Sequence, residues 1–129
     1  MSTTTVRGLG ASPGKARGRL VLSVTEARRL AAQGPVVLVL RDCRSDEARV
    51  LTEAAALVTV RGGVTGHGAI IARALGKPCI VACRFLEPKP GDALVEVHPE
   101  GGSGLAYPEG CVVEVDGARG LVTFEQADP

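Results

Sequence analysis

The chain has 129 residues, of which 45% are hydrophobic and 22% charged, and its formal net charge is +1. This length suits one domain with a hydrophobic core and is too short for two, so residues 1–129 are expected to form a single domain. A nearly neutral chain without a basic block lacks the electrostatic footprint of a nucleic-acid-binding or membrane-surface protein. We therefore expect neither nucleic acid nor a membrane as a partner.

The location and redox state follow from what the sequence lacks. No apolar stretch is long enough to span a bilayer, and the N-terminus has no apolar signal-peptide segment, so a cytoplasmic location is expected. The four cysteines, Cys43, Cys79, Cys83 and Cys111, should then be reduced. Cys79 and Cys83 are four apart, but no second close pair or neighbouring histidine completes a zinc pattern. We expect buried or half-buried thiols and no metal site.

The first part of the chain predicts a tail, a turn and a helix. Residues 1–5 are expected to be a flexible polar tail. The glycine- and proline-rich segment 8–18 predicts a tight turn and a bulge, followed by a strand that contains the apolar run 20–22. Thr25 is a plausible N-cap for a helix over 26–33, which a Gly-Pro pair then ends.

The centre of the chain alternates between strands and helices. Residues 36–40 and 56–60 are continuous apolar runs, which are typical of strands buried on both faces. Between them, Ser45 is expected to cap a helix over 46–55. A third buried run covers residues 79–82. Strands that alternate with helices in this way imply parallel pairing through helical crossovers.

A further helix is expected between the second and third of these strands. Ile70, Ile71, Ala74 and Leu75 recur at the spacing of one helical face, which predicts a helix over 68–75. Gly76 and Pro78 then end it.

The C-terminal third has a different character. Residues 84–110 are rich in Pro, Gly and Glu and are expected to form a loop-rich insertion, with only 93–97 resembling a strand. The Gly-Gly-Ser-Gly run at 101–104 predicts a flexible turn or linker. Residues 111–115 and 121–124, separated by Asp-Gly-Ala-Arg-Gly, indicate a hairpin.

The stretch 61–73 contains the main candidate for chemistry, because His67 lies just after a strand and at the entrance to a helix. Unpaired backbone N–H groups and the positive end of the helix dipole meet there, which suits the binding of phosphate. A neutral imidazole is a good nucleophile towards phosphorus near pH 7. Taken alone, His67 is equally consistent with a structural, helix-capping histidine.

Other residues of this stretch could assist. Thr65 could hydrogen-bond a phosphate or orient the imidazole. Arg61 or Arg73 could offset its charge, although Arg73 on a solvated helix face is an equal alternative. His98 lacks such a setting and is expected to be a surface residue. Four glycines would let the backbone pass close to a bulky charged donor: Gly62, Gly63, Gly66 and Gly68.

Residues 62–73, followed by Gly-Lys-Pro-Cys-Ile-Val at 76–81, resemble the phosphohistidine loop of the phosphoenolpyruvate-utilising enzymes. These include pyruvate phosphate dikinase, phosphoenolpyruvate synthase and the first enzyme of the sugar phosphotransferase system. Their loop reads roughly Gly-Gly-x-Thr-Ser-His-Ala-Ala-Ile-x-Ala-Arg and lies in a swivelling domain that carries phosphate between two distant active sites. Segment 8–18 and the C-terminal hairpin are similar too, so the resemblance covers nearly the whole chain and is closest to the dikinase.

The resemblance implies an α/β fold of the swivelling β/β/α type, with a parallel βαβ centre and a C-terminal antiparallel hairpin. It also implies a kinase-type phosphotransferase component in which His67 accepts a phosphoryl group from ATP or phosphoenolpyruvate and passes it on. The expected partners are an ATP-grasp-like nucleotide-binding domain and a phosphoenolpyruvate/pyruvate-binding domain. Mg²⁺ and ATP would belong to these partners and not to this chain, which would be inactive alone.

Two departures from the family pattern leave an alternative open. Gly66 replaces the usual serine before the histidine, and Ala48 stands where the family often has an acidic residue. A non-catalytic regulatory or binding module that keeps the swivelling fold is therefore the competing interpretation. The antibiotic phosphotransferases that use a related domain are a third, with no mark of their own in this sequence.

Overall fold

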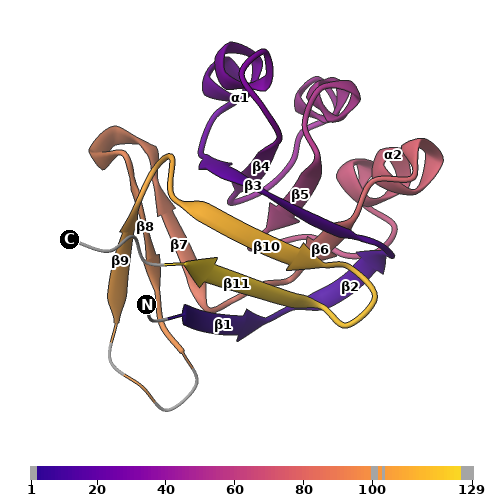
Figure 1. Cartoon of the computed structure of the whole chain (residues 1–129). Coiled ribbons are helices and arrows are strands. Elements are labelled where there is room, and N and C mark those ends of the chain that lie inside the picture. Colours follow the sequence, from indigo (N-terminus) through magenta and orange to yellow (C-terminus); the bar gives the residue numbers. More distant parts are fainter. Residues whose placement is uncertain (1–2, 100–101, 103, 126–129) are drawn as a thin grey trace.

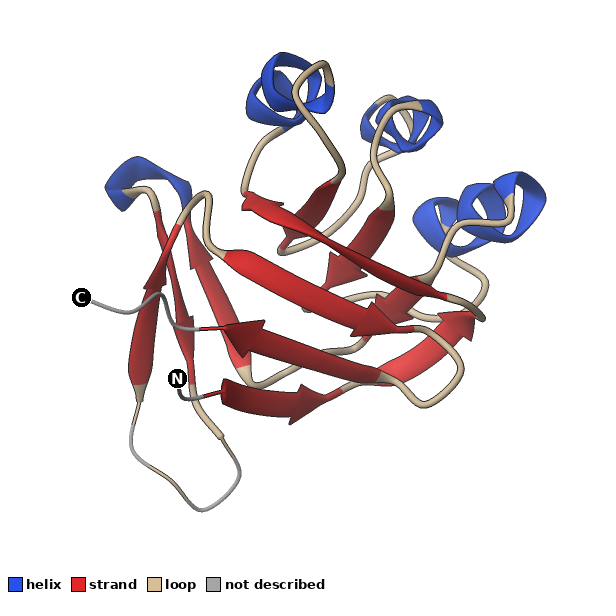
Figure 2. Ribbon diagram, in the orientation of Figure 1, coloured by secondary structure: helices blue, strands red, loops and turns tan. Residues whose placement is uncertain are grey.

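The computed structural model describes residues 3–99, 102 and 104–125, which form two sheets with helices over one face of the larger sheet (Figures 1 and 2). The larger sheet has the order β1-β11-β10-β3-β4-β5-β6-β2, and the smaller β7-β8-β9. The strands of the larger sheet are β1 (Thr3–Arg7), β2 (Leu9–Ser12), β3 (Lys15–Val21), β4 (Val36–Leu40), β5 (Ala56–Thr59), β6 (Cys79–Val81), β10 (Val112–Asp116) and β11 (Leu121–Glu125). Those of the smaller sheet are β7 (Leu86–Lys89), β8 (Leu94–Val97) and β9 (Leu105–Pro108).

The helices are α1 (Val24–Ala31) and α2 (His67–Leu75), with two 3₁₀ helices, η1 (Glu47–Thr52) and η2 (Pro90–Asp92). Strands β3, β4, β5 and β6 are parallel, and α1, η1 and α2 connect them in turn along the same face (Figure 1). Neighbouring strands that run parallel need crossover connections of this kind. The predicted α/β fold with a parallel centre is confirmed, and so is the C-terminal hairpin of β10 and β11.

Two hydrophobic cores flank the parallel strands. Because side chains alternate along a strand, Val37 and Val39 of β4 enter one core, while Val36, Leu38 and Leu40 enter the other. The second core lies under the helices. The first lies between the opposite face, the smaller sheet and the hairpin. All five residues of β4 are buried, as the continuous apolar run predicted.

The first two helices begin and end at residues other than those predicted. Ser23, not Thr25, caps α1: its Oγ accepts a hydrogen bond from the backbone N–H of Glu26 at 3.2 Å. The expected second helix over 46–55 is instead the short 3₁₀ helix η1, and its start has no side-chain cap from Ser45. It ends early because the N–H of Ala55 bonds to the carbonyl of Val36 at 2.8 Å, which already brings the chain back to the sheet.

Helix α2 lies where it was predicted, but the expected apolar stripe is not the face that packs. Ile70 and Leu75 are 49% and 42% exposed, and Ile71 is exposed as well. The buried residues are Gly68, Ala69 and Ala72. Small side chains let the helix approach the sheet closely, so the larger ones point outwards.

Two regions that were expected to be irregular are strands. Thr3–Thr5 of the predicted tail belong to β1 and pair with β11, where the hydroxyls of Thr5 and Thr123 lie 3.0 Å apart. The predicted insertion 84–110 contains the three strands of the smaller sheet, not one. Both predictions were wrong, because polar or proline-containing segments can still pair when one face is buried. Positions 101 and 103 of the predicted linker lie outside the described residues.

Other details agree with the sequence. The expected bulge before β3 is a register shift between Gly10 and Ser12 in the β2–β6 pairing. Of the helices that the structure describes, none is long and apolar enough to cross a membrane.

Candidate functional site

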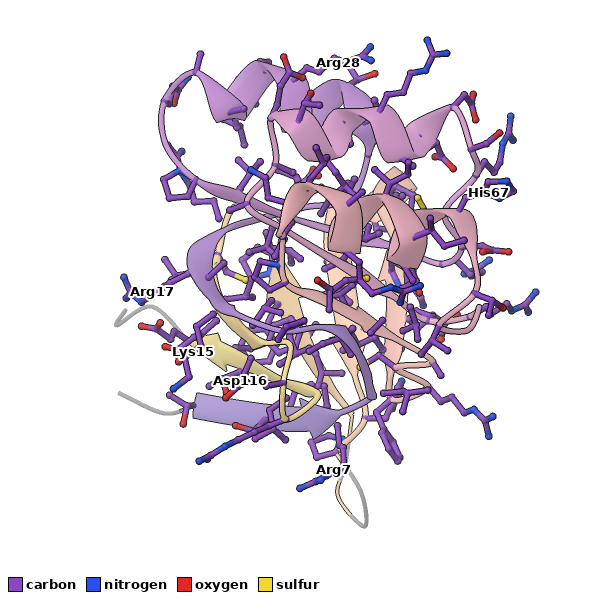
Figure 3. The ribbon with its side chains drawn as sticks, turned by 90° about the vertical axis from the view of Figure 1, so that its right-hand side faces the viewer. Arg7, Lys15, Arg17, Arg28, His67 and Asp116 are labelled. Carbon is purple, nitrogen blue, oxygen red and sulfur yellow. The ribbon has the colours of Figure 1, made fainter. Side chains whose placement is uncertain are left out.

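His67 stands at the edge of the parallel sheet where the strands end. It is the first residue of α2, and the loop that precedes it follows β5 directly. Its side chain is exposed and projects away from the body of the protein (Figure 3). In open α/β sheets this edge is the usual location for ligands and chemistry.

The start of α2 has no side-chain cap. Gly66 occupies the N-cap position in an extended conformation, with φ −71° and ψ 162°, and has no side chain to accept from the first turn. No described side chain takes its place. The first-turn N–H groups therefore remain available to an anion next to the imidazole of His67.

The loop glycines serve different purposes. Gly62 has φ +99°, which favours glycine because other residues are strained there. A Cβ on Gly68 would lie 2.7 Å from Leu57 Cδ2 and 3.1 Å from Cys43 Cβ, so this glycine allows α2 to pack closely on the sheet. A Cβ added to Gly63 would have no neighbouring atom within 4 Å, so this position faces open space.

Two side chains hold the loop in place. The hydroxyl of Thr59, a buried residue, donates to the carbonyl of Arg61 at 2.7 Å. From the far side, Arg73 Nη2 donates to the carbonyl of Val64 at 2.6 Å and Nη1 to the carbonyl of Ala11 at 3.0 Å. Arg73 thus ties the loop to β2. The sequence did not identify Thr59, although a hydroxyl at the end of an apolar strand was a possible signal.

Replacing Arg73 with methionine should loosen this loop. Methionine keeps a long, flexible side chain but lacks both hydrogen-bond donors. The loss of these hydrogen bonds near the surface should cost the loop about 1 kcal/mol of stability. We expect faster amide hydrogen exchange at 62–66, while the exchange of β4 stays unchanged. Unchanged protection of the loop would contradict the assigned role of Arg73.

The residues predicted around His67 come together only in part. Gly62, Gly63, Gly66, Gly68 and His67 line one narrow cleft, with Arg61, Asp42 and Thr59. Thr65 is exposed. It stays a prediction that Thr65 assists His67. It likewise stays a prediction that the loop glycines and Arg73 bind phosphate.

The thiols near the loop are poor nucleophiles. Burial raises the pKa of Cys43 to about 11, and nearby carboxylates such as that of Glu47 add to the effect. Burial likewise raises the pKa of Cys79 to about 12. Both thiols stay protonated near neutral pH, so they do not compete with the imidazole.

The second histidine lies on the smaller sheet. The side chain of His98 is 49% exposed, and its Nε2 lies 3.4 Å from Glu96 Oε2. This agrees with its prediction as a surface residue. Glu87 lies beside the pair, and potential ligand atoms of these three residues lie within 4.8 Å of one another. Lys89 already forms an ion pair with Glu96, and this exposed group is separate from the histidine loop.

Fold and loop together define a swivelling-type α/β domain that presents an exposed histidine at an uncapped helix start. The family model for the "PEP-utilising enzyme, mobile domain" matches residues 32–120. The chain therefore belongs to the family of the mobile domains of phosphoenolpyruvate-utilising enzymes.

Similar proteins agree with this assignment. The chain is 32% identical over 120 residues to a pyruvate, phosphate dikinase of Rickettsia conorii, which covers 93% of the chain but 13% of that enzyme. It is 39% identical over 119 residues to a phosphoenolpyruvate synthase of Aeropyrum pernix, covering 91% of the chain and 12% of the enzyme. The chain thus spans about an eighth of the length of these relatives.

Solved structures support the fold. The N-terminal domain of Enzyme 1 - Nitrogen matches with a TM-score of 0.61 at 12% identity, covering 92% of this chain and 93% of that one. Aconitase X from Thermococcus kodakaraensis matches with a TM-score of 0.54 at 17% identity, covering 95% and 99% of the two chains. Proteins of different chemistry share this fold, so function has to be argued from the site.

Proposed function

We propose that the chain is a phosphoryl carrier and that His67 is its acceptor. The observation that carries the proposal is the position of His67: an exposed imidazole at the first residue of α2, beside backbone N–H groups that no described side chain caps. Membership of the family and the identity to the dikinase and the synthase support it.

The chemistry needs one nucleophile and a place for the transferred group. The unprotonated imidazole nitrogen of His67 attacks the phosphorus of ATP or phosphoenolpyruvate and forms a P–N bond, while the bond to ADP or to the pyruvate enolate breaks. The group later leaves when an acceptor oxygen attacks the same phosphorus and the P–N bond breaks. The N–H groups at the start of α2 would stabilise the phosphoryl oxygens between the two steps.

The carrier would act with partner domains or chains. The proposed partners are an ATP-grasp-like nucleotide-binding unit and a phosphoenolpyruvate/pyruvate-binding unit, which would supply ATP and Mg²⁺. The outward-facing Ile70, Ile71 and Leu75 support contact with another protein surface, because grouped exposed apolar residues favour association. With Ser45, Ala48 and Thr52 of the neighbouring segment, Ile71 and Leu75 line a hollow of about 520 Å³.

The alternative is a non-catalytic module of the same fold. Gly66 leaves the position before His67 without a hydroxyl, which favours this alternative. Ala48 favours it less, because it is buried in η1 and serves packing.

The test is to mix the chain with partner enzyme and isotopically labelled phosphoenolpyruvate. We expect up to one phosphoryl group per chain, labile in acid and stable in base, as a phosphoramidate is. The chain with phosphoenolpyruvate or ATP alone should show no sustained turnover. An acid-stable label, or none on a folded chain with an active partner, would favour the non-catalytic module.

A further inference from the structure

Arginines follow three neighbouring parallel strands at the edge that holds the histidine loop. Arg41 follows β4, Arg61 follows β5 and Arg84 follows β6, each within three residues of the strand end. Because the strands are parallel, these positions meet at one edge of the sheet. All three side chains are exposed.

Backbone hydrogen bonds beyond the strand ends fix this arrangement. The N–H of Arg61 bonds to the carbonyl of Arg41 at 2.8 Å, which extends the β4–β5 pairing. The N–H of Cys83 bonds to the carbonyl of Thr59 at 3.0 Å, which brings the next strand's end alongside. Ala82, the residue directly before Cys83, has φ +52°, which is an unfavourable conformation for a non-glycine residue. Such strain persists where the surrounding structure enforces it, often at functional sites.

Arg61 and Arg84 line one hollow, of about 390 Å³, together with Val60, Gly62 and Ala82. The residues that line it include two arginines and no acidic residue. Neither arginine forms an ion pair with a residue of the described ranges, in contrast to Arg17, whose guanidinium binds Glu125 with two hydrogen bonds of 2.8 Å. A solvated pair of unneutralised guanidinium groups attracts anions.

This hollow adjoins the histidine loop on one side. Arg61 lines both the hollow and the narrow cleft that contains His67. On its other side, Arg61 lines a hollow of about 380 Å³ together with Arg41, but Asp42 and Glu47 also line that one. The carboxylate-free hollow between Arg61 and Arg84 is therefore the more favourable place for a negative ligand.

We propose that Arg61 and Arg84 form an anion-binding site that takes the phosphate group of a phosphorylated small molecule. Guanidinium groups bind phosphate oxygens in pairs of parallel hydrogen bonds. The hollow lies at the same edge of the sheet as the histidine loop, where a ligand can reach it from solvent. The site would hold the donor or the product beside His67. This role rests on the proposed function, whereas anion binding itself does not.

The test is a titration of the 129-residue chain with pyrophosphate, and separately with phosphoenolpyruvate, at low ionic strength, followed by calorimetry and backbone amide shifts. Arg61→Gln and Arg84→Gln should each weaken binding about tenfold, which corresponds to about 1.4 kcal/mol, because each removes a charge-assisted hydrogen-bond donor. Arg28→Gln is the matched control: this exposed arginine lies on α1, apart from His67 (Figure 3), and lines neither hollow, so its loss should change affinity less than about twofold. His67→Ala should retain the affinity.

Several results would overturn the proposal. They are no saturable binding, an equal loss with Arg28→Gln, or a loss with His67→Ala that would place the anion in the histidine loop. Binding of an acidic peptide but not of pyrophosphate would assign the surface to a protein partner instead. Saturable binding that needs Arg61 and Arg84, without any labelling of His67 by donor and partner, would contradict the carrier function and leave the anion site standing.

Discussion

Replacing Phe124 with alanine is expected to destabilise the domain by about 3–5 kcal/mol, which is the usual cost of removing a buried phenylalanine. Phe124 on β11 is fully buried, and its ring centre lies 5.1 Å from that of Tyr107 on β9. The pair connects the larger sheet with the smaller one. By volume, Phe124 is the largest fully buried side chain among the described residues, so its truncation leaves a large cavity.

The measurement is urea unfolding followed by circular dichroism, since the chain has no tryptophan to report by fluorescence. The midpoint should fall sharply with an unchanged m-value. Leu105→Ala is the control, because Leu105 lies on the same small sheet but is 45% exposed, and its effect should stay within about 0.5 kcal/mol. A loss below about 1 kcal/mol for Phe124→Ala would show that the two sheets do not depend on this contact.

Replacing His67 with alanine should reduce phosphorylation by donor and partner to the background of a reaction without donor. The fold should be unaffected: the side chain is exposed, it makes no hydrogen bond to a described residue, and alanine suits the first turn of a helix. We expect a melting temperature within about 2 °C of the parent chain. Labelling is measured by the phosphate retained on the chain.

His98→Ala is the control for this prediction. His98 directly follows β8 of the smaller sheet, and its side chain lies beside that of Glu96. Because His98 is not part of the histidine loop, its loss should leave labelling intact. Labelling that survives His67→Ala but not His98→Ala would reverse the assignment. A large fall in melting temperature for His67→Ala would instead make His67 a structural residue.

The sequence predicted the parallel centre well because each element there has a strong local signal. The run 36–40 is buried on both faces and so is wholly apolar, and Gly76 ends α2 with the left-handed φ of +68° typical of a helix C-terminus. His67 was found because a strand, a glycine pair and a helix start follow one another directly. Local patterns of this kind depend little on the rest of the chain.

What the sequence missed depends on contacts between distant segments. The smaller sheet forms because Val95, Val97 and Tyr107 are buried in the core shared with the larger sheet, while neighbouring residues of the same strands, such as Glu96 and Ala106, are more exposed. Likewise, α2 buries Gly68, Ala69 and Ala72 because the sheet beneath comes close, a fact that the spacing of Ile70 and Leu75 cannot reveal. Arg73, weighed as a phosphate ligand or a solvated residue, donates to two backbone carbonyls, one of them on β2, and local spacing could not reveal these contacts.

The most direct measurement is the position of the phosphoryl group on the wild-type chain. After labelling with partner enzyme and phosphoenolpyruvate, peptide mapping under alkaline conditions and phosphorus NMR should place it on a ring nitrogen of His67, within the peptide that contains residues 62–73. The uncapped start of α2 and the exposed imidazole together predict this result. A phosphoryl group on His98, or on the hydroxyl of Ser12 or Thr65, would contradict the carrier assignment.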